Sequence, residues 1–235
     1  MNYTTKNTNT DSYSIFEIAG PIMIGPSSSH TAGACKIGQM ARALFHKQPG
    51  KVTFILHGSF AEVYQGHATD KALVAGIIRL KTGDPKIKHS FELAAKKGIE
   101  FQFKKGNLGP EYHPNTAKII MEKNGRPNMT VIGSSIGGGK SKIVKIDDFP
   151  VDLNIQAGFK TIVVWHDNNK THLTQLCNKI EKNGNNIHNI QTTTISKEAI
   201  SIINTDGPDF TLSEIKKLEK QKGIKEIRSL IKLQQ

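Results

Sequence analysis

The chain has 235 residues, of which 37% are hydrophobic and 22% are charged, and its formal net charge is +12. This length suits one large domain or two ordinary ones, and it allows a buried core. No apolar run approaches the roughly 20 residues that span a bilayer, and the polar start of the chain has no export segment. We therefore expect a cytoplasmic protein without membrane association.

The positive charge raises the alternative of a nucleic-acid-binding protein. The lysines are scattered, however, and groups such as Lys96-Lys97 are separated from one another by acidic or apolar residues. Aromatic residues make up only 6% of the chain, so few are available to stack on bases. We expect a solvated, lysine-rich surface and no nucleic-acid partner. Cys35 and Cys177 lie far apart without metal-ligand spacing, and we expect both to be reduced thiols.

The first predicted elements follow a polar tail. Residues 1–12 are expected to be disordered, and ordered structure is expected from residue 13. A loop at residues 20–31 leads into an amphipathic helix, in which apolar residues recur at helical spacing from Ile37 to Phe45. The next elements are predicted to be a strand at residues 52–56, a helix beginning near Thr69 and a helix at residues 90–97.

From residue 99 the hydrophobic period changes to two, which indicates β-strands. These strands are predicted at residues 99–103, 117–123, 129–133 and 142–146. The turn sequence at residues 124–127, Asn-Gly-Arg-Pro, makes the middle pair a predicted hairpin. Helices followed by an antiparallel run of strands are typical of an α+β domain, which we expect to cover residues 13–149.

A break in the pattern at residues 150–159 predicts a linker before a second domain at residues 160–235. The second domain is predicted to have the order strand, helix, strand, strand, helix, strand. These six elements are predicted at residues 161–166, 172–182, 187–195, 198–204, 212–220 and 226–233. The order βαββαβ is typical of a ferredoxin-like unit.

The most informative stretch is residues 25–33, Gly-Pro-Ser-Ser-Ser-His-Thr-Ala-Gly. Its three adjacent serines, His30 and Thr31 stand directly before a predicted helix, where free backbone N–H groups and the helix dipole favour an anion such as a carboxylate. One serine or threonine is enough to cap a helix. Because four hydroxyl groups accompany the imidazole, the stretch indicates a ligand site rather than an elaborate cap.

Two further loops carry a histidine beside polar groups. His67 lies just before the helix that begins near Thr69, and alone it fits a structural role as well as a functional one. His113 and Asn115 flank Pro114, whose fixed φ holds both side chains in place, although such residues are also ordinary in turns. Convergence of these loops with residues 25–33 on one polar pocket is the simplest joint interpretation.

Two other loops have features of phosphate or small-ligand sites. Residues 134–141 nearly match the phosphate-binding pattern G-x-x-x-x-G-K-S/T, but Ser134 replaces the first glycine and the following residues alternate like a strand. We expect a glycine-rich connection between strands there. Residues 167–171 join a strand to a helix in the second domain, and either a small-ligand site or a plain turn fits them.

Five motifs stand at residues 25–34, 57–61, 66–70, 113–117 and 135–139. In order and spacing they resemble the beta chain of bacterial iron-sulfur-dependent L-serine dehydratase, an L-serine ammonia-lyase. The resemblance covers about residues 13–235, and its Ser-Ser-Ser-His-Thr and His-Pro-Asn-Thr motifs are specific when they occur together. It implies an N-terminal domain with an allosteric-substrate-binding fold and a C-terminal ACT domain.

The resemblance implies deamination of L-serine to pyruvate and ammonia by a complex of two different chains. A 4Fe-4S cluster, carried by the partner alpha subunit, acts as a Lewis acid on the serine hydroxyl while a base removes the α-proton. This chain itself then binds no metal and lines the substrate cavity. The site residues transferred by motif are Ser28, Ser29, His30, Thr31, His67, His113 and Asn115.

The chain departs from the family pattern at two places. Ala68 stands where the family usually has glycine, and we expect this to shift the backbone beside His67. Lys170 and Thr171 occupy the region where ACT domains usually place a glycine, which argues for a role in assembly rather than in effector binding. The main alternative function is a regulatory amino-acid-sensing ACT protein without catalytic residues.

Overall fold

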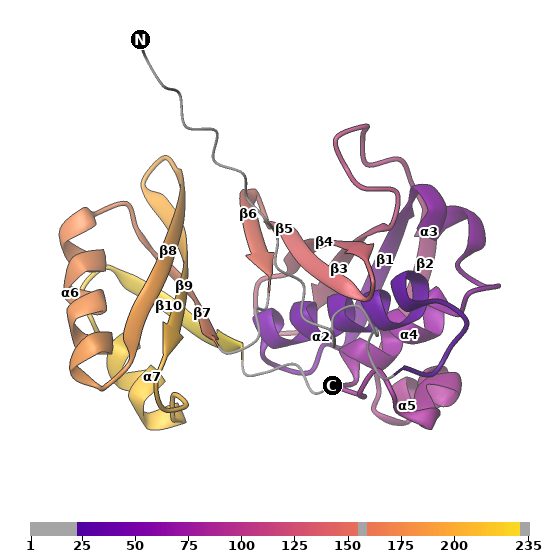
Figure 1. Cartoon of the computed structure of the whole chain (residues 1–235), viewed down its shortest axis with the longest axis horizontal. Coiled ribbons are helices and arrows are strands. Elements are labelled where there is room, and N and C mark those ends of the chain that lie inside the picture. Colours follow the sequence, from indigo (N-terminus) through magenta and orange to yellow (C-terminus); the bar gives the residue numbers. More distant parts are fainter. Residues whose placement is uncertain (1–22, 155–158, 231–235) are drawn as a thin grey trace, which may run out of the picture.

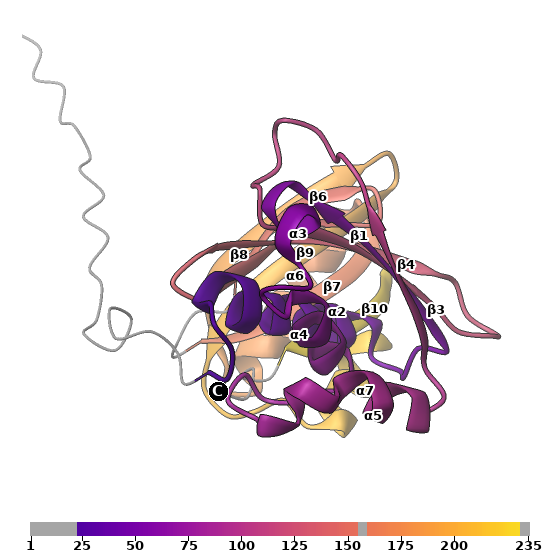
Figure 2. The same cartoon turned by 90° about the vertical axis from the view of Figure 1, so that its right-hand side faces the viewer.

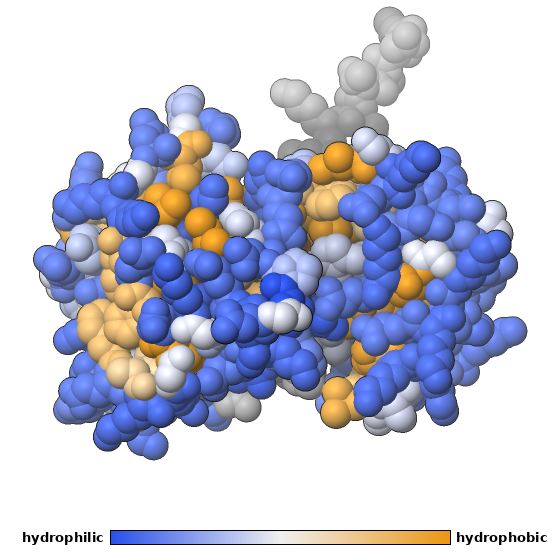
Figure 3. Space-filling view, turned by 180° about the vertical axis from the view of Figure 1, so that it is seen from behind, coloured by the Kyte–Doolittle hydropathy of each residue, from blue (hydrophilic) through white to orange (hydrophobic). Residues whose placement is uncertain are grey.

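The computed structural model describes residues 23–154 and 159–230 of the chain. They form two sheets with helices, a mixed α+β architecture as predicted (Figure 1). The expected disorder of residues 1–12 lies outside the described residues. Among the described residues, no helix combines the length and the apolar character needed to cross a bilayer. Figure 3 shows one face of the molecule, which is largely hydrophilic with scattered hydrophobic patches.

The first sheet has six strands in the order β2-β1-β3-β4-β5-β6. Its strands are β1 (Lys51–His57), β2 (Glu100–Lys105), β3 (Thr116–Glu122), β4 (Met129–Gly137), β5 (Lys140–Ile146) and β6 (Phe149–Asn154). β3 and β4 form the predicted antiparallel hairpin. β2, however, runs parallel to β1, so the prediction of an all-antiparallel run was wrong at this strand. The chain crosses over between β1 and β2 through the helices, as a parallel pair requires.

β6 corrects the predicted linker, because residues 149–154 pair with β5 as a strand. Phe149 and Leu153 point into the core with period two. Pro150 had indicated a break, but β6 is an edge strand, where a missing N–H group is tolerated. Residues 155–158, the middle of the predicted linker, lie outside the described residues.

Helices cover one face of this sheet (Figure 2). The helical segments of this part of the chain are the π-helix η1 (Ser28–Gly33), α2 (Ala34–Phe45), α3 (Gly58–Val63), α4 (Thr69–Ile77), the 3-10 helix η2 (Pro85–His89) and α5 (Ser90–Lys96). α2 and α4 approach closely through two glycines: a Cβ atom on Gly76 would lie 2.2 Å from the carbonyl oxygen of Cys35 and 2.7 Å from the Cα atom of Gly38. This close contact holds the C-terminal end of α4 beside the first turns of α2.

The second sheet is antiparallel, with the order β10-β7-β9-β8. Its elements are β7 (Lys160–Asp167), α6 (Lys170–Lys182), β8 (Asn186–Ile195), β9 (Glu198–Asp206), α7 (Leu212–Glu219) and β10 (Ile224–Leu230). The order βαββαβ is the predicted one. Side chains of α6 and α7 cover one face of this sheet, where Leu176, Ile180 and Leu218 pack on Ile162 and Val164.

The other face of the second sheet packs against the first part of the chain. Val163, Ile200, Ile202 and Leu230 belong to the same buried cluster as the apolar residues of α2. The two sheets are therefore joined by a continuous hydrophobic core.

Candidate active site

The serine-rich stretch forms the π-helix η1, which runs directly into α2. Ser27 is its N-cap, and the Ser27 hydroxyl accepts a hydrogen bond from the backbone N–H of His30 at 3.1 Å. Gly25 has φ +138, and a Cβ atom there would lie 2.5 Å from the Thr31 side chain. Capping thus occupies one hydroxyl of the stretch. Short π-helical turns are frequent at functional sites.

His30 lies between two hydroxyl groups and a second imidazole. Its Nε2 atom is 3.1 Å from Ser59 Oγ, and its Nδ1 atom is 3.3 Å from Ser27 Oγ. The ring centroids of His30 and His67 are 5.0 Å apart, and the edge of the Phe60 ring closes another side. Burial, and then the neighbouring His67, lower the pKa of His30 below its ordinary value. The imidazole is therefore neutral near pH 7.

His67 is tied to the same cluster through its backbone, because Thr31 Oγ1 donates a hydrogen bond to the His67 carbonyl oxygen at 3.1 Å. His67 Nδ1 and Thr69 Oγ1 are buried and have no hydrogen-bond partner within the described structure. Between them, Ala68 has φ +55, a left-handed conformation that favours glycine. Buried polar atoms without partners and strained backbone are two features that recur at functional sites.

The loop around Pro114 reaches the cluster through its backbone. The Phe60 N–H donates to the Pro114 carbonyl oxygen at 3.3 Å, and the Ser135 N–H donates to the Asn115 carbonyl oxygen at 2.9 Å. The His113 side chain is exposed, and its Nδ1 atom accepts from the Asn115 N–H at 3.1 Å. The structure thus places this loop at the site without a direct side-chain contact between His113 and either of the other two histidines in the described contacts.

The glycine-rich stretch is the turn between β4 and β5, since strand β5 begins at Lys140. This agrees with the predicted strand connection and not with a phosphate-binding loop. The hairpin packs against η1: Ser141 Oγ donates to the Gly33 carbonyl oxygen at 2.9 Å, and a Cβ atom on Gly33 would lie 2.1 Å from Ser135 Oγ. All five motif stretches therefore meet at one end of the first sheet.

Among the residues predicted from the sequence, the structure brings His30, Thr31 and His67 together, and Ser28 and Ser29 are half-buried on η1. Ser27 and Ser59 were not predicted as site residues. Ser59 stands in the His-Gly-Ser motif at residues 57–59, and this motif was the available signal.

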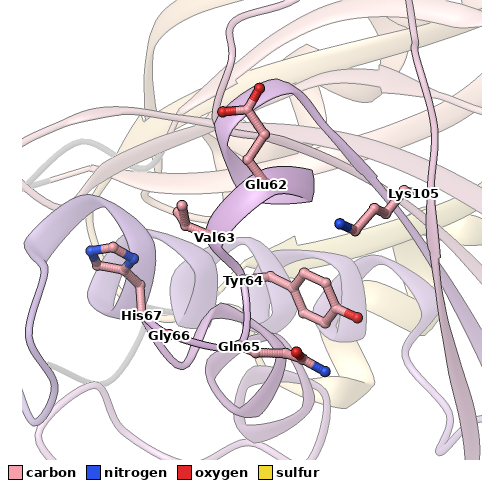
Figure 4. A pocket seen from close by; sticks show the side chains of 7 residues that line it. All are labelled: Glu62, Val63, Tyr64, Gln65, Gly66, His67 and Lys105. Atoms are coloured by element: carbon pink, nitrogen blue, oxygen red, sulfur yellow. The ribbon is translucent and has the colours of Figure 1, made fainter.

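A hollow of about 350 Å³ borders the cluster at His67. It is lined by Glu62, Val63, Tyr64, Gln65, Gly66, His67 and Lys105. Figure 4 shows the side chains of Glu62, Lys105 and Tyr64 around this hollow, while the His67 imidazole is directed to the other side of the loop. His67 borders the hollow, whereas His30 is not among the residues that line it.

The described residues do not fit an iron-sulfur cluster. Cys35 is buried in α2, where burial raises the pKa of its thiol to about 12, and Cys177 lies on α6 in the second sheet unit. In the described ranges, no group of three His, Cys, Asp or Glu side chains is arranged to hold a metal ion. A cluster needs several thiolate ligands, and this part of the chain does not supply them.

Imidazole and hydroxyl groups that converge from separate loops at the end of a sheet are typical of enzyme subunits that act on small polar substrates. Residues 14–145 match the family profile described as serine dehydratase beta chain. The chain is 42% identical to the L-serine dehydratase beta chain of Peptoniphilus asaccharolyticus, over 77% of this chain and 80% of the relative. It is 39% identical to a probable L-serine dehydratase beta chain of Bacillus subtilis strain 168, over 87% and 93%. The chain therefore belongs to the serine dehydratase beta chain family, and the resemblance inferred from the motifs is confirmed.

Proposed function

We propose that this chain is the beta subunit of an L-serine dehydratase, which deaminates L-serine to pyruvate and ammonia together with an alpha subunit. Family membership and the names of both relatives support this function. The observation that carries it is the meeting of five loop segments around the His30 and His67 rings, whose centroids lie 5.0 Å apart.

The side chains around His30 and His67 suit the zwitterionic form of L-serine. Hydroxyl groups at the start of η1, from Ser28, Ser29 and Thr31, are neutral donors for a carboxylate. The neutral His30 ring, whose two nitrogens contact serine hydroxyls, lines the cavity without repelling the substrate ammonium group. His67, with its buried Nδ1 atom free of partners in the described structure, is in position to accept a proton or to bind the substrate. His113 and Asn115 complete the proposed lining from the neighbouring loop.

The partner in this proposal is an alpha subunit that carries the 4Fe-4S cluster. A chain named beta implies a differently named companion, and both relatives carry that name. The poor fit of the described residues to a cluster supports its location on the partner. The active form is then a hetero-oligomer in which this chain supplies one wall of the substrate cavity.

We further propose that residues 160–235 are an ACT domain and that the first part has an allosteric-substrate-binding fold. The strand order β10-β7-β9-β8 with two helices on one face supports the first assignment. In the turn before α6, Asn169 Oδ1 accepts from the Thr171 N–H at 2.9 Å, and Asp167 pairs with His172 at 2.8 Å. Internal contacts thus occupy this turn, which favours a role in assembly.

Reconstitution tests the proposal. The chain and its alpha partner are purified separately and together under anaerobic conditions, and pyruvate formation from L-serine is measured. We expect activity in the complex alone. Full activity of this chain by itself, or none in the complex, would contradict the proposal.

Two variants distinguish the catalytic role from the regulatory alternative. In the complex, His30→Ala and Asn115→Ala are expected to lower kcat/KM by about tenfold or more, because each removes a polar contact from the cavity. His89→Ala, at an exposed histidine on η2, is the control. Unchanged turnover in both site variants would favour an amino-acid sensor without catalytic residues.

A further inference from the structure

Both ring nitrogens of His30 face a serine hydroxyl, and the two serines come from different segments. Ser27 precedes η1 and approaches Nδ1 at 3.3 Å, while Ser59 stands on α3 and approaches Nε2 at 3.1 Å. With Phe60 against its side, the ring has no freedom to rotate without breaking both contacts. The two serine contacts therefore fix the plane of the His30 imidazole.

The direction of the hydrogen bonds follows from what each group already does. A neutral imidazole has one donor and one acceptor nitrogen. Ser27 Oγ already accepts the backbone N–H of His30, and accepting a hydrogen bond makes a hydroxyl a stronger donor. This favours donation from Ser27 O–H to Nδ1, in which case Nε2–H donates to Ser59 Oγ. The hydrogen of the Ser59 hydroxyl is left free for a further acceptor.

We propose that Ser27 and Ser59 are positioning residues that hold His30 in one ring plane and in the Nε2–H tautomer. This inference rests on the proposed dehydratase function for its catalytic consequence, because His30 lines the proposed substrate cavity. The proposed orientation of the His30 ring rests only on its contacts with the two serine hydroxyls. The two serines act through His30 and are distinct from the residues that touch the substrate.

The first test is spectroscopic and uses the full-length chain labelled with ¹⁵N-histidine. The His30 signals, identified by their loss in His30→Gln, are expected to show a protonated Nε2 and an unprotonated Nδ1. Ser59→Ala removes the acceptor of Nε2–H, so both ring resonances are expected to move toward a mixture of tautomers. Ser59→Thr keeps a hydroxyl and is expected to restore the wild-type spectrum. Ser213→Ala, on the exposed side of α7, is the matched control.

The second test is kinetic and uses the complex with the alpha chain. Ser59→Ala and Ser27→Ala are each expected to lower kcat/KM about tenfold, near the effect of one lost hydrogen bond. Ser59→Thr is expected to stay within about twofold of the wild type, and Ser213→Ala to match it.

A protonated Nδ1 in the wild type, or identical His30 resonances in wild type and Ser59→Ala, would overturn the inference. If circular dichroism shows that Ser59→Ala does not fold, the His30 resonances of Ser27→Ala are compared with those of Ser59→Thr and the wild type instead. A wild-type complex without serine dehydratase activity would refute the proposed function, whereas the spectra would still decide the positioning of His30.

Discussion

His166 is the only histidine among the fully buried residues of the described ranges, with 2% of its surface exposed. Its Nδ1 atom lies 2.6 Å from the Asp167 carbonyl oxygen, which can only accept, so this nitrogen carries the proton. Nε2 therefore accepts from the Ser201 hydroxyl at 2.8 Å, and Ser201 Oγ is 2.7 Å from Thr192 Oγ1. A second proton on the ring would require the Ser201 hydroxyl to turn and accept from Nε2–H.

Burial lowers the pKa of His166 below its ordinary value, which predicts a loss of stability in mild acid. At a pH between the lowered pKa of folded His166 and the ordinary value of 6.5, the unfolded chain binds more protons than the folded chain. The free energy of unfolding is therefore highest above pH 6.5 and falls as the pH drops from 6.5 through the pKa of the folded state. Burial also lowers the pKa of His30 and His46, with effects in the same direction.

Urea unfolding of the chain at pH 7.5 and at pH 5.5 measures this effect. We expect a lower midpoint at pH 5.5 and a smaller difference between the two midpoints in His166→Gln. Equal stability at both pH values would show that burial of these imidazoles does not favour their neutral form.

At the scale of single residues, the sequence predicted which stretches meet at the site but not the contacts within it. Hydroxyls and an imidazole before a helix start are visible in the motif around His30. The contact between His30 and Ser59 joins residues 29 positions apart, and it depends on how α3 packs beside η1. That packing is a tertiary property without a local signal. For the same reason, the motif led to the prediction of Ser28 and Ser29 as site residues, whereas the serine of this stretch that contacts the His30 ring is Ser27.

At the scale of elements, hydrophobic period predicted five helices and most strands, because each buries one face along its own length. It did not predict the short helices α3 and η2. It did not predict the direction of β2, since residues 99–103 alternate in the same way in a parallel or an antiparallel neighbour. It also missed β6, where Pro150 outweighed the alternation of Phe149, Val151 and Leu153. Which strands pair, and which strand lies at the edge, depends on the assembly of the whole sheet.

The contact between α2 and α4 gives a prediction for these two elements. In Gly76→Ala the new methyl group would lie 2.2 Å from the Cys35 carbonyl oxygen, so the helices must move apart. Alanine gains up to about 1 kcal/mol in helix propensity, but overpacking costs about 1–3 kcal/mol, and we expect a net loss of stability. Because η1 continues into α2, activity of the complex should fall as well.

Thermal unfolding of Gly76→Ala and of the control Gly50→Ala checks this expectation. A Cβ atom on Gly50 would meet its nearest neighbour at 3.8 Å, an ordinary contact, so this control should unfold near the wild-type temperature. A Gly76→Ala chain as stable as the control would show that the two helices tolerate a wider separation.

At the scale of the whole molecule, Arg126 joins three parts of the structure. From the β3–β4 hairpin its guanidinium donates to the Phe45 carbonyl oxygen at 2.9 Å and lies 4.6 Å from the centre of the Phe45 ring. It also faces Glu226 of β10 at 3.7 Å. The C-terminal end of α2, the hairpin and the second sheet are thus held at one partly buried guanidinium.

Arg126→Ala is expected to destabilise the chain by about 1.5–3 kcal/mol, because a charged hydrogen bond to a backbone carbonyl group is lost. Lys142→Ala removes the Lys142–Asp152 ion pair, whose side chains are 34% and 56% exposed, and should change stability by less than about 1 kcal/mol. Chemical unfolding of both variants makes the comparison. Equal effects would place Arg126 among ordinary surface ion pairs.

The core shared by the two sheets has a consequence for expressing the two parts of the chain, divided near residue 155, as separate fragments. In the intact chain, apolar side chains of the second sheet pack against apolar side chains of α2. The C-terminal fragment would expose Val163, Ile200, Ile202 and Leu230 to water, and the N-terminal fragment would expose the apolar side chains of α2. Exposed patches of this kind promote aggregation. Separately expressed halves should therefore be poorly soluble, and mixing them should recover soluble material.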